Sequence, residues 1–207
     1  MDESRHKLPL RSIRLEALGD GIFAVAMTLL ALDIKWPELK DTSLHNFIRS
    51  FLDVLPALFC YGISFIVLGI MWFGHRMVFE YIGKTNRHFI YLGVIFYMMV
   101  CLVPLSTRLL AENKLQWGTI LVYGLNLSFC NLSLYAQWSY GIHRTGFLER
   151  DLPDEVKSAA KISFLISPVI YAVAVIISFW MPVVSLIFFI LTPILYLIPN
   201  KLDKYLP

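Results

Sequence analysis

The chain has 207 residues, of which 57% are hydrophobic and 16% charged, and its formal net charge is +3. This composition excludes an ordinary soluble domain, in which about a quarter of the residues are charged. The charge is small and no basic stripe carries interleaved aromatic residues, so nothing indicates nucleic-acid binding. Long apolar runs recur along the whole sequence, and we therefore expect a single polytopic membrane domain over residues 1–207.

Six membrane-spanning helices are expected, which makes the predicted fold class all-α. Their ranges are 12–34, 46–78, 88–111, 115–142, 157–180 and 182–199. About 20 helical residues at 1.5 Å each cross a hydrocarbon core of roughly 30 Å. The second range is longer than this, so its helix is expected to tilt or to project into water. Kinks are expected at Pro104, Pro168 and Pro193.

The three cysteines, Cys60, Cys101 and Cys130, all lie in apolar runs and show no CxxC spacing. This pattern is against a disulfide framework and against a zinc site. We interpret all three as small buried hydrophobic residues, and we expect no cofactor.

Lysine and arginine are distributed unequally between the two sides of this arrangement. The N-terminus, the 76–87 turn, the 143–161 loop and the C-terminal tail carry most of the 18 basic residues. Basic loops stay in the cytoplasm, and an even number of spans returns the chain to the side where it started. We therefore expect a multi-pass protein of the cell membrane with both termini cytoplasmic.

The first span has two different faces. At 100° per residue, several side chains fall within about 40° of the line through Val25, and Thr28 lies at about 60°. This narrow face consists of Leu18, Gly21, Val25, Thr28, Leu29 and Leu32, with Arg14 at its start. Asp20 lies about 140° away from that line. A carboxylate inside a membrane span needs a partner and is by default a candidate functional residue.

The end of the second span supplies possible partners for that carboxylate. The two spans run in opposite directions, so Trp72 and His75 lie at a depth similar to that of Asp20. These groups form a buried polar clamp between helices, a proton relay, or an ion site. A catalytic His–Asp pair is the least favoured interpretation, because neither GxSxG nor HExxH occurs. The sequence therefore predicts that the protein is not an enzyme.

A second polar stripe lies on the fourth span. Its members, Asn126, Cys130, Ser133 and Gln137, fall within about 40° of one line along a helix. Such side chains join helices by hydrogen bonds or line an aqueous cavity. Thr28 likewise either bonds back to its own helix or, if copies of the first span surround an axis, forms a ring of hydroxyls. The filter sequence TVGYG is absent.

The segment RLEALGD, from Arg14 to Asp20, resembles the transmembrane-protein-175 family of endolysosomal and prokaryotic potassium channels. The signature of that family opens its first helix with arginine, three residues and then Phe-Ser-Asp. Here Leu18-Gly19 stands where Phe-Ser is expected. Further matches are the W-x-x-H pattern of Trp72 and His75, and Pro104-Leu105-Ser106-Thr107 late in the third span.

The resemblance implies a potassium-selective channel of four six-helix subunits, with the narrow face of each first helix lining a central pore. It places the hydrophobic constriction at Val25, a hydroxyl layer that contacts K⁺ transiently at Thr28, and further apolar layers at Leu29 and Leu32. The implied partners are K⁺, membrane lipid and further copies of the chain. Because valine is smaller than the isoleucine or leucine common at that constriction, a wider closed state is expected.

Behind the pore helix, the resemblance implies a structural and gating network. Its members are Arg14, Asp20, Trp72 and His75. The alternative to a channel is a secondary transporter or proton-coupled carrier that uses Asp20, His75 and the Asn126 stripe.

Overall fold

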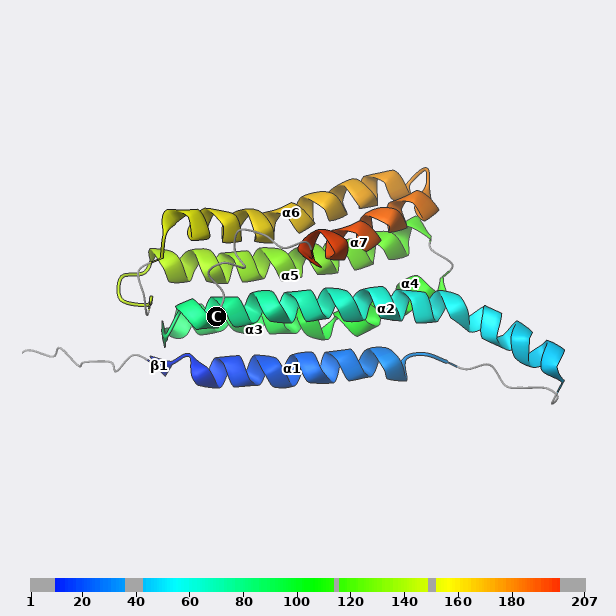
Figure 1. Ribbon diagram of the computed structural model, residues 1–207, viewed down its shortest axis with the longest axis horizontal. Coiled ribbons are helices and arrows are strands. Elements are labelled where there is room, and N and C mark those ends of the chain that lie inside the picture. Colours follow the sequence, from blue (N-terminus) through cyan, green and yellow to red (C-terminus); the bar gives the residue numbers. More distant parts are fainter. Residues whose placement is uncertain (1–9, 36–42, 114–115, 149–151, 198–207) are drawn as a thin grey trace, which may run out of the picture.

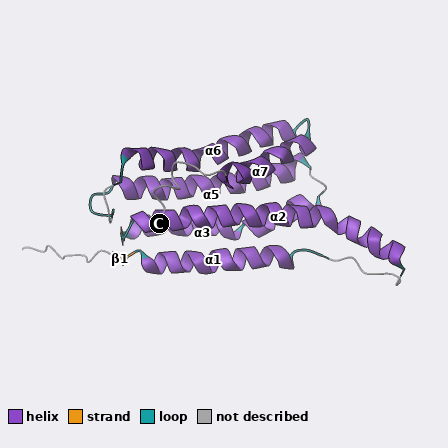
Figure 2. Ribbon diagram, in the orientation of Figure 1, coloured by secondary structure: helices purple, strands orange, loops and turns teal. Residues whose placement is uncertain are grey.

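The computed structural model describes residues 10–35, 43–113, 116–148 and 152–197. Helices account for most of these ranges and lie side by side in an elongated bundle (Figures 1 and 2). They are α1 (Ile13–Leu32), α2 (Leu44–Tyr81), α3 (Arg87–Cys101), α4 (Val103–Glu112), α5 (Trp117–His143), α6 (Asp154–Ser178) and α7 (Pro182–Leu197).

Five helical stretches of the described chain are long and apolar enough to cross a membrane. They are α1, α2, the stretch Arg87–Glu112 that joins α3 and α4, α5 and α6; α7 is a shorter apolar helix. The all-α membrane fold predicted from the sequence is therefore confirmed. At 38 residues, α2 is much longer than a bilayer core requires, and its N-terminal end extends beyond the other helices (Figure 1).

The third expected span is divided into two helices. α3 ends at Cys101 and α4 begins at Val103, with Leu102 between them. Pro104 occupies the first turn of α4, where the missing N–H is tolerated, and its ring disfavours helix in the preceding turn. Pro168 and Pro193 lie inside α6 and α7, which continue through them as single helices.

Short strand contacts join three segments at one end of the bundle. β1 (Leu10–Arg11) pairs antiparallel with β2 (Lys84–Thr85), and Ile82 forms a bridge with Leu148. The segment before α1, the α2–α3 turn and the α5–α6 loop therefore meet at the same end. The positive-inside pattern assigns these three segments to one side of the membrane.

α1 lies at the edge of the bundle and packs mainly on α2, α3 and α4 (Figure 1). One stripe of α1 is buried against them, and its members follow each other at intervals of three or four residues, as one helical face requires. They are Leu15, Gly19, Phe23, Ala26 and Leu30.

Cys60 and Cys130 are buried, as predicted from the sequence, but Cys101 is exposed. The prediction was wrong there because Cys101 ends α3 on its outward face, where Val94 and Met98 are exposed as well. In a membrane protein, an apolar run contains lipid-facing positions as well as buried ones.

Candidate functional site

The narrow face of α1 is uncovered in the single chain. Its large aliphatic side chains have exposed fractions of 51% for Leu18, 57% for Val25, 42% for Leu29 and 78% for Leu32. Gly21 and Thr28 are exposed as well. All six residues assigned to this face from the helical period therefore point away from α2, α3 and α4.

Thr28 is the one hydroxyl on this face, and its proton is already used. Thr28 Oγ1 donates a hydrogen bond to the carbonyl oxygen of Val25, with an oxygen–oxygen distance of 2.8 Å. Since a hydroxyl carries a single proton, the remaining lone pairs of Oγ1 can only accept. At this level, the narrow face offers oxygen electron density to a cation and no donor to an anion.

Asp20 on α1 is bonded to Trp72 on α2. The indole Nε1–H donates to Oδ1 of the carboxylate at 2.8 Å. The side chain of Asp20 remains exposed, while that of Trp72 is half-buried. Of the two partners considered from the sequence, the structure selects the indole. The bond connects α1 to α2 on the side away from the narrow face.

His75 takes part in a different set of contacts. It is fully buried, and its Nε2 lies 2.8 Å from the hydroxyl oxygen of Tyr97 on α3. The Tyr97 hydroxyl in turn donates to the carbonyl oxygen of Leu15 on α1 at 2.6 Å. The rings of Phe23 and Phe96 surround the imidazole. Sequence reasoning missed Tyr97, and the only available signal was a hydroxyl-bearing ring in an otherwise apolar span.

Arg14 is not brought into this network. Its side chain is exposed, and no hydrogen bond or ion pair joins it to another described residue. Of the four residues assigned to the network, Asp20 and Trp72 are bonded to each other, His75 lies in the adjacent set of contacts, and Arg14 stands apart in the single chain. Its place on the helical wheel explains this, because Arg14 shares the narrow face rather than the buried stripe.

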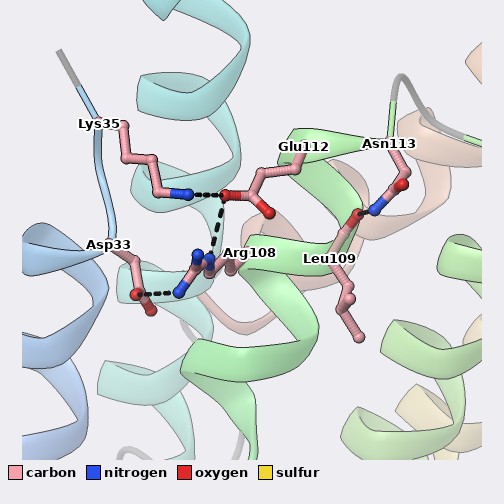
Figure 3. Close-up of polar contacts among 6 residues, drawn as sticks. All are labelled: Asp33, Lys35, Arg108, Leu109, Glu112 and Asn113. Atoms are coloured by element: carbon pink, nitrogen blue, oxygen red, sulfur yellow. Dashed lines mark hydrogen bonds and ion pairs between the residues drawn. The ribbon is translucent and has the colours of Figure 1, made fainter.

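The opposite end of α1 is attached to α4 by charged side chains (Figure 3). Lys35 Nζ lies 2.8 Å from Glu112 Oε1, and Arg108 Nε lies 3.1 Å from the same oxygen. Arg108 Nη1 also lies 3.6 Å from Asp33 Oδ1. We call these four residues the outer ionic cluster. It borders a cavity of about 130 Å³ between α1, α2 and α4. Sequence reasoning missed this cluster, since two of its three ion pairs join α4 to the end of α1 across more than seventy positions.

The segment Pro104–Thr107 connects α4 to two further helices. Thr107 Oγ1 lies 2.8 Å from Ser64 Oγ on α2, which lies 2.9 Å from the Tyr123 hydroxyl on α5. Asn126 on α5 donates from Nδ2 to Ser106 Oγ at 3.0 Å. The hydroxyls singled out in this segment therefore join α2, α4 and α5 in the bundle interior.

The polar stripe of α5 serves packing in the single chain. Asn126, Cys130 and Gln137 are buried, and Ser133 donates to carbonyl oxygens of its own helix. Among the described residues, no hydrogen bond joins this stripe to Asp20 or His75. The described residues also contain no group of three or more His, Cys, Asp or Glu side chains placed to hold a metal ion.

The part of the chain that forms this site matches a known protein family. The model of the family described as "Endosomal/lysosomal potassium channel TMEM175" matches residues 14–104, from the first turn of α1 to the first turn of α4. A potassium channel of Streptomyces collinus is 35% identical over 139 residues, which are 65% of this chain and 66% of that protein. The chain belongs to the TMEM175 family. The resemblance inferred from Arg14, Asp20, Trp72 and His75 is thereby confirmed.

Other TMEM175 relatives agree with this assignment. A potassium channel of Chamaesiphon minutus is 37% identical over 99 residues, 48% of this chain and 49% of that protein. The crystal structure of a lysosomal potassium-selective TMEM175 homolog from Chamaesiphon minutus superposes with a TM-score of 0.78 at 26% identity, covering 90% of this chain and 96% of that one. The sequence alignments thus span about two thirds and one half of these two relatives, whereas the fold matches over nearly the whole chain.

Proposed function

We propose that this TMEM175 protein conducts potassium passively, through a pore formed where copies of α1 meet, and that it is neither an enzyme nor dependent on a cofactor. The uncovered narrow face is the observation that carries the proposal. Four large aliphatic side chains and one hydroxyl line an exposed helical face, and the same helix is bonded to α2 and α3 on its other sides. The relatives named potassium channels support the choice of ion.

The proposed assembly is a homotetramer of six-helix membrane domains. Four copies of α1 around one axis turn the narrow faces toward a common path, which removes this exposed apolar surface from contact with lipid. Both termini are proposed to be cytoplasmic, because the segments joined at the β1–β2 end carry the basic residues.

In this arrangement, the narrow face acts in two ways on a passing ion. Rings of Val25, Leu29 and Leu32 make an apolar constriction that gates by dewetting. Potassium gives up its hydration water more readily than sodium does, so such a constriction favours potassium. At Thr28, the oxygen lone pairs offset part of the lost hydration, since the hydroxyl proton points back to the Val25 carbonyl.

Among the described residues, the polar groups suggested for a proton-coupled carrier form no common hydrogen-bonded set. Asp20 is bonded to Trp72, His75 to Tyr97, and Asn126 to Ser106. A carrier needs its substrate and coupling-ion ligands around one site near the bilayer midplane. The carrier alternative therefore has less structural support than the channel.

Flux through reconstituted vesicles tests the proposal. With a potassium gradient and no other driving ion, a channel sets the membrane potential to the potassium Nernst value, and planar bilayers show unitary currents. Vesicles without protein are the control. Transport that saturates at low turnover, or that requires a coupled ion, contradicts the proposal. Light scattering of the detergent-solubilised protein tests the tetramer, with four copies per particle as the expected result.

A further inference from the structure

Gly19 lies on the buried stripe of α1, where side chains from two other helices converge. A Cβ atom at this position would lie 2.5 Å from His75 Cε1 and 2.8 Å from the Tyr97 hydroxyl oxygen. Both distances are shorter than real Cβ contacts, so glycine alone leaves the two side chains where they are. Glycine inside a helix costs about 1 kcal/mol relative to alanine. At Gly19, the missing side chain leaves space for His75 and Tyr97 to approach the backbone of α1.

The hydrogen bonds at this point have one consistent set of proton positions. The Leu15 carbonyl oxygen can only accept, so the single proton of the Tyr97 hydroxyl goes to it. His75 Nε2 must then donate to the Tyr97 oxygen. Nδ1 has no hydrogen-bond partner among the described residues, so a second proton there would have no acceptor. The arrangement therefore favours neutral His75 with its proton on Nε2. A directed chain of two bonds runs from α2 through α3 to α1.

This chain attaches to α1 differently from the Trp72 bond. Tyr97 binds a main-chain carbonyl, whereas Trp72 binds the side chain of Asp20. Around the helix axis, Gly19 lies about 120° from Val25 in one direction, and Asp20 lies about 140° from it in the other. A helix held at two points around its circumference cannot rotate without losing one of them. The direction in which Val25 points is thus set by the bonds of Trp72 and Tyr97 to the other sides of α1.

We propose that Tyr97 is a positioning residue, whose hydroxyl reaches the backbone of α1 through the space left by Gly19 and fixes the rotation of that helix. It thereby decides which side chains the narrow face presents. The effect on conduction rests on the proposed function, because rotation of α1 matters to an ion only if α1 lines its path. Tyr97 itself is buried at 3% exposure, away from the narrow face.

The test compares Tyr97→Phe with Tyr91→Phe in the full-length protein in vesicles. Tyr91 lies on the same helix and is 62% exposed, so its variant makes the same chemical change away from α1. Cysteines are introduced singly at Val25 and at the half-buried Ile22, with Cys101→Ser removing the exposed native thiol. The rate of modification by a charged, water-soluble thiol reagent is measured at each position. We expect Tyr97→Phe to lower the Val25-to-Ile22 rate ratio several-fold, and Tyr91→Phe to leave it unchanged.

Nitrogen NMR of His75 provides a readout that general loosening of the fold does not produce. The wild type is expected to show one neutral tautomer with the proton on Nε2, and Tyr97→Phe a mixture of both. A second variant, Gly19→Ala, displaces His75 and Tyr97 by contact and is expected to lower the rate ratio in the same direction. Gly62→Ala is its control, because nothing lies within 4 Å of a Cβ there.

The outcomes separate the two proposals. An unchanged rate ratio in Tyr97→Phe overturns the positioning role, whatever the potassium flux and the His75 tautomer. A wild-type protein that passes no potassium overturns the proposed function, and the rate-ratio comparison then still decides the role of Tyr97. Should Tyr97→Phe fail to fold, Gly19→Ala decides by its own rate ratio, with an unchanged value counting against Tyr97.

Discussion

Trp72 on α2 donates its indole N–H to the carboxylate of Asp20 on α1 at 2.8 Å. This bond gives the ionisable side chain in the first span a hydrogen-bond partner. Because the carboxylate lies about 140° around the helix from Val25, its charge is kept out of the apolar face. The bond therefore has a structural consequence and an electrostatic one, and each can be measured.

Replacing Trp72 by phenylalanine keeps an aromatic ring and removes the donor. We expect a loss of about 1–2 kcal/mol in stability, since the bond involves a charged acceptor but lies in a membrane protein. Thermal unfolding in detergent measures it. Asp20→Asn keeps an acceptor for the indole and should cost less. Trp180→Phe, at a position 78% exposed, is the matched control. Equal unfolding temperatures for the Trp72 and Trp180 variants would contradict a stabilising bond.

Enlarging Val25 tests whether it forms the narrowest ring. Val25→Leu adds a methylene group in each copy and should lower single-channel conductance several-fold, because the apolar constriction becomes tighter. Val94→Leu makes the same change on α3 at a position 48% exposed, away from the narrow face, and should leave conductance unchanged. Equal conductance in the Val25 variant and the wild type argues that the constriction lies elsewhere.

Two substitutions at Thr28 separate the effect of its hydroxyl on conduction from the effect of its shape. Thr28→Val keeps the shape and removes the oxygen, and we expect potassium conductance to fall several-fold, as the loss of about 1 kcal/mol of stabilisation implies. Thr28→Ser keeps the oxygen and should stay close to the wild type. Unitary currents measure the conductance of each variant, and bi-ionic reversal potentials measure its selectivity for potassium over sodium. If the serine variant is as impaired as the valine variant, the hydroxyl is not the relevant group.

The outer ionic cluster should matter more for local order than for global stability. Its side chains are substantially exposed, and exposed ion pairs contribute about 0–1 kcal/mol. Arg108→Gln is therefore expected to change the unfolding temperature little, yet to speed amide hydrogen exchange at residues 33–35, where α1 loses its attachment to α4. Raising the salt concentration should produce the same change in the wild type. Lys157→Gln, which removes an exposed pair with Asp154 on α6, is the control.

The hydroxyl chain in the interior should contribute to stability. Thr107→Val removes the bond to Ser64 while keeping the side-chain volume nearly constant, and we expect a loss of about 0.5–1.5 kcal/mol. Thr119→Val is the control, because its hydroxyl bonds only to a carbonyl at the start of its own helix. Chemical unfolding in mixed micelles compares them. No difference between the two variants would show that the interhelical bond adds nothing.

The faces of α1 were predictable because they depend on the helical period alone. Leu18, Val25 and Leu32 fall on one line at 100° per residue, and the structure leaves all three exposed. The break in the third span was equally accessible, since Pro104 acts through its own ring and missing N–H. In both cases, the controlling interaction is local in the sequence.

The contacts that were not predicted connect distant parts of the chain. Tyr97 bonds to Leu15 across 82 positions, and Lys35 to Glu112 across 77. A single sequence shows that such groups exist, but the relative height and rotation of the helices decide whether they meet. Gly19 illustrates the limit, because its lack of a side chain has meaning only once His75 and Tyr97 are placed around it.

The pairing of β1 with β2 has a mechanical consequence. Ser12 alone separates the strand residue Arg11 from the first residue of α1, and Ser12 is itself hydrogen-bonded to Gly83. No flexible linker therefore lies between β1 and α1. A force that separates β1 from β2 would therefore act directly on α1, the helix that carries Val25.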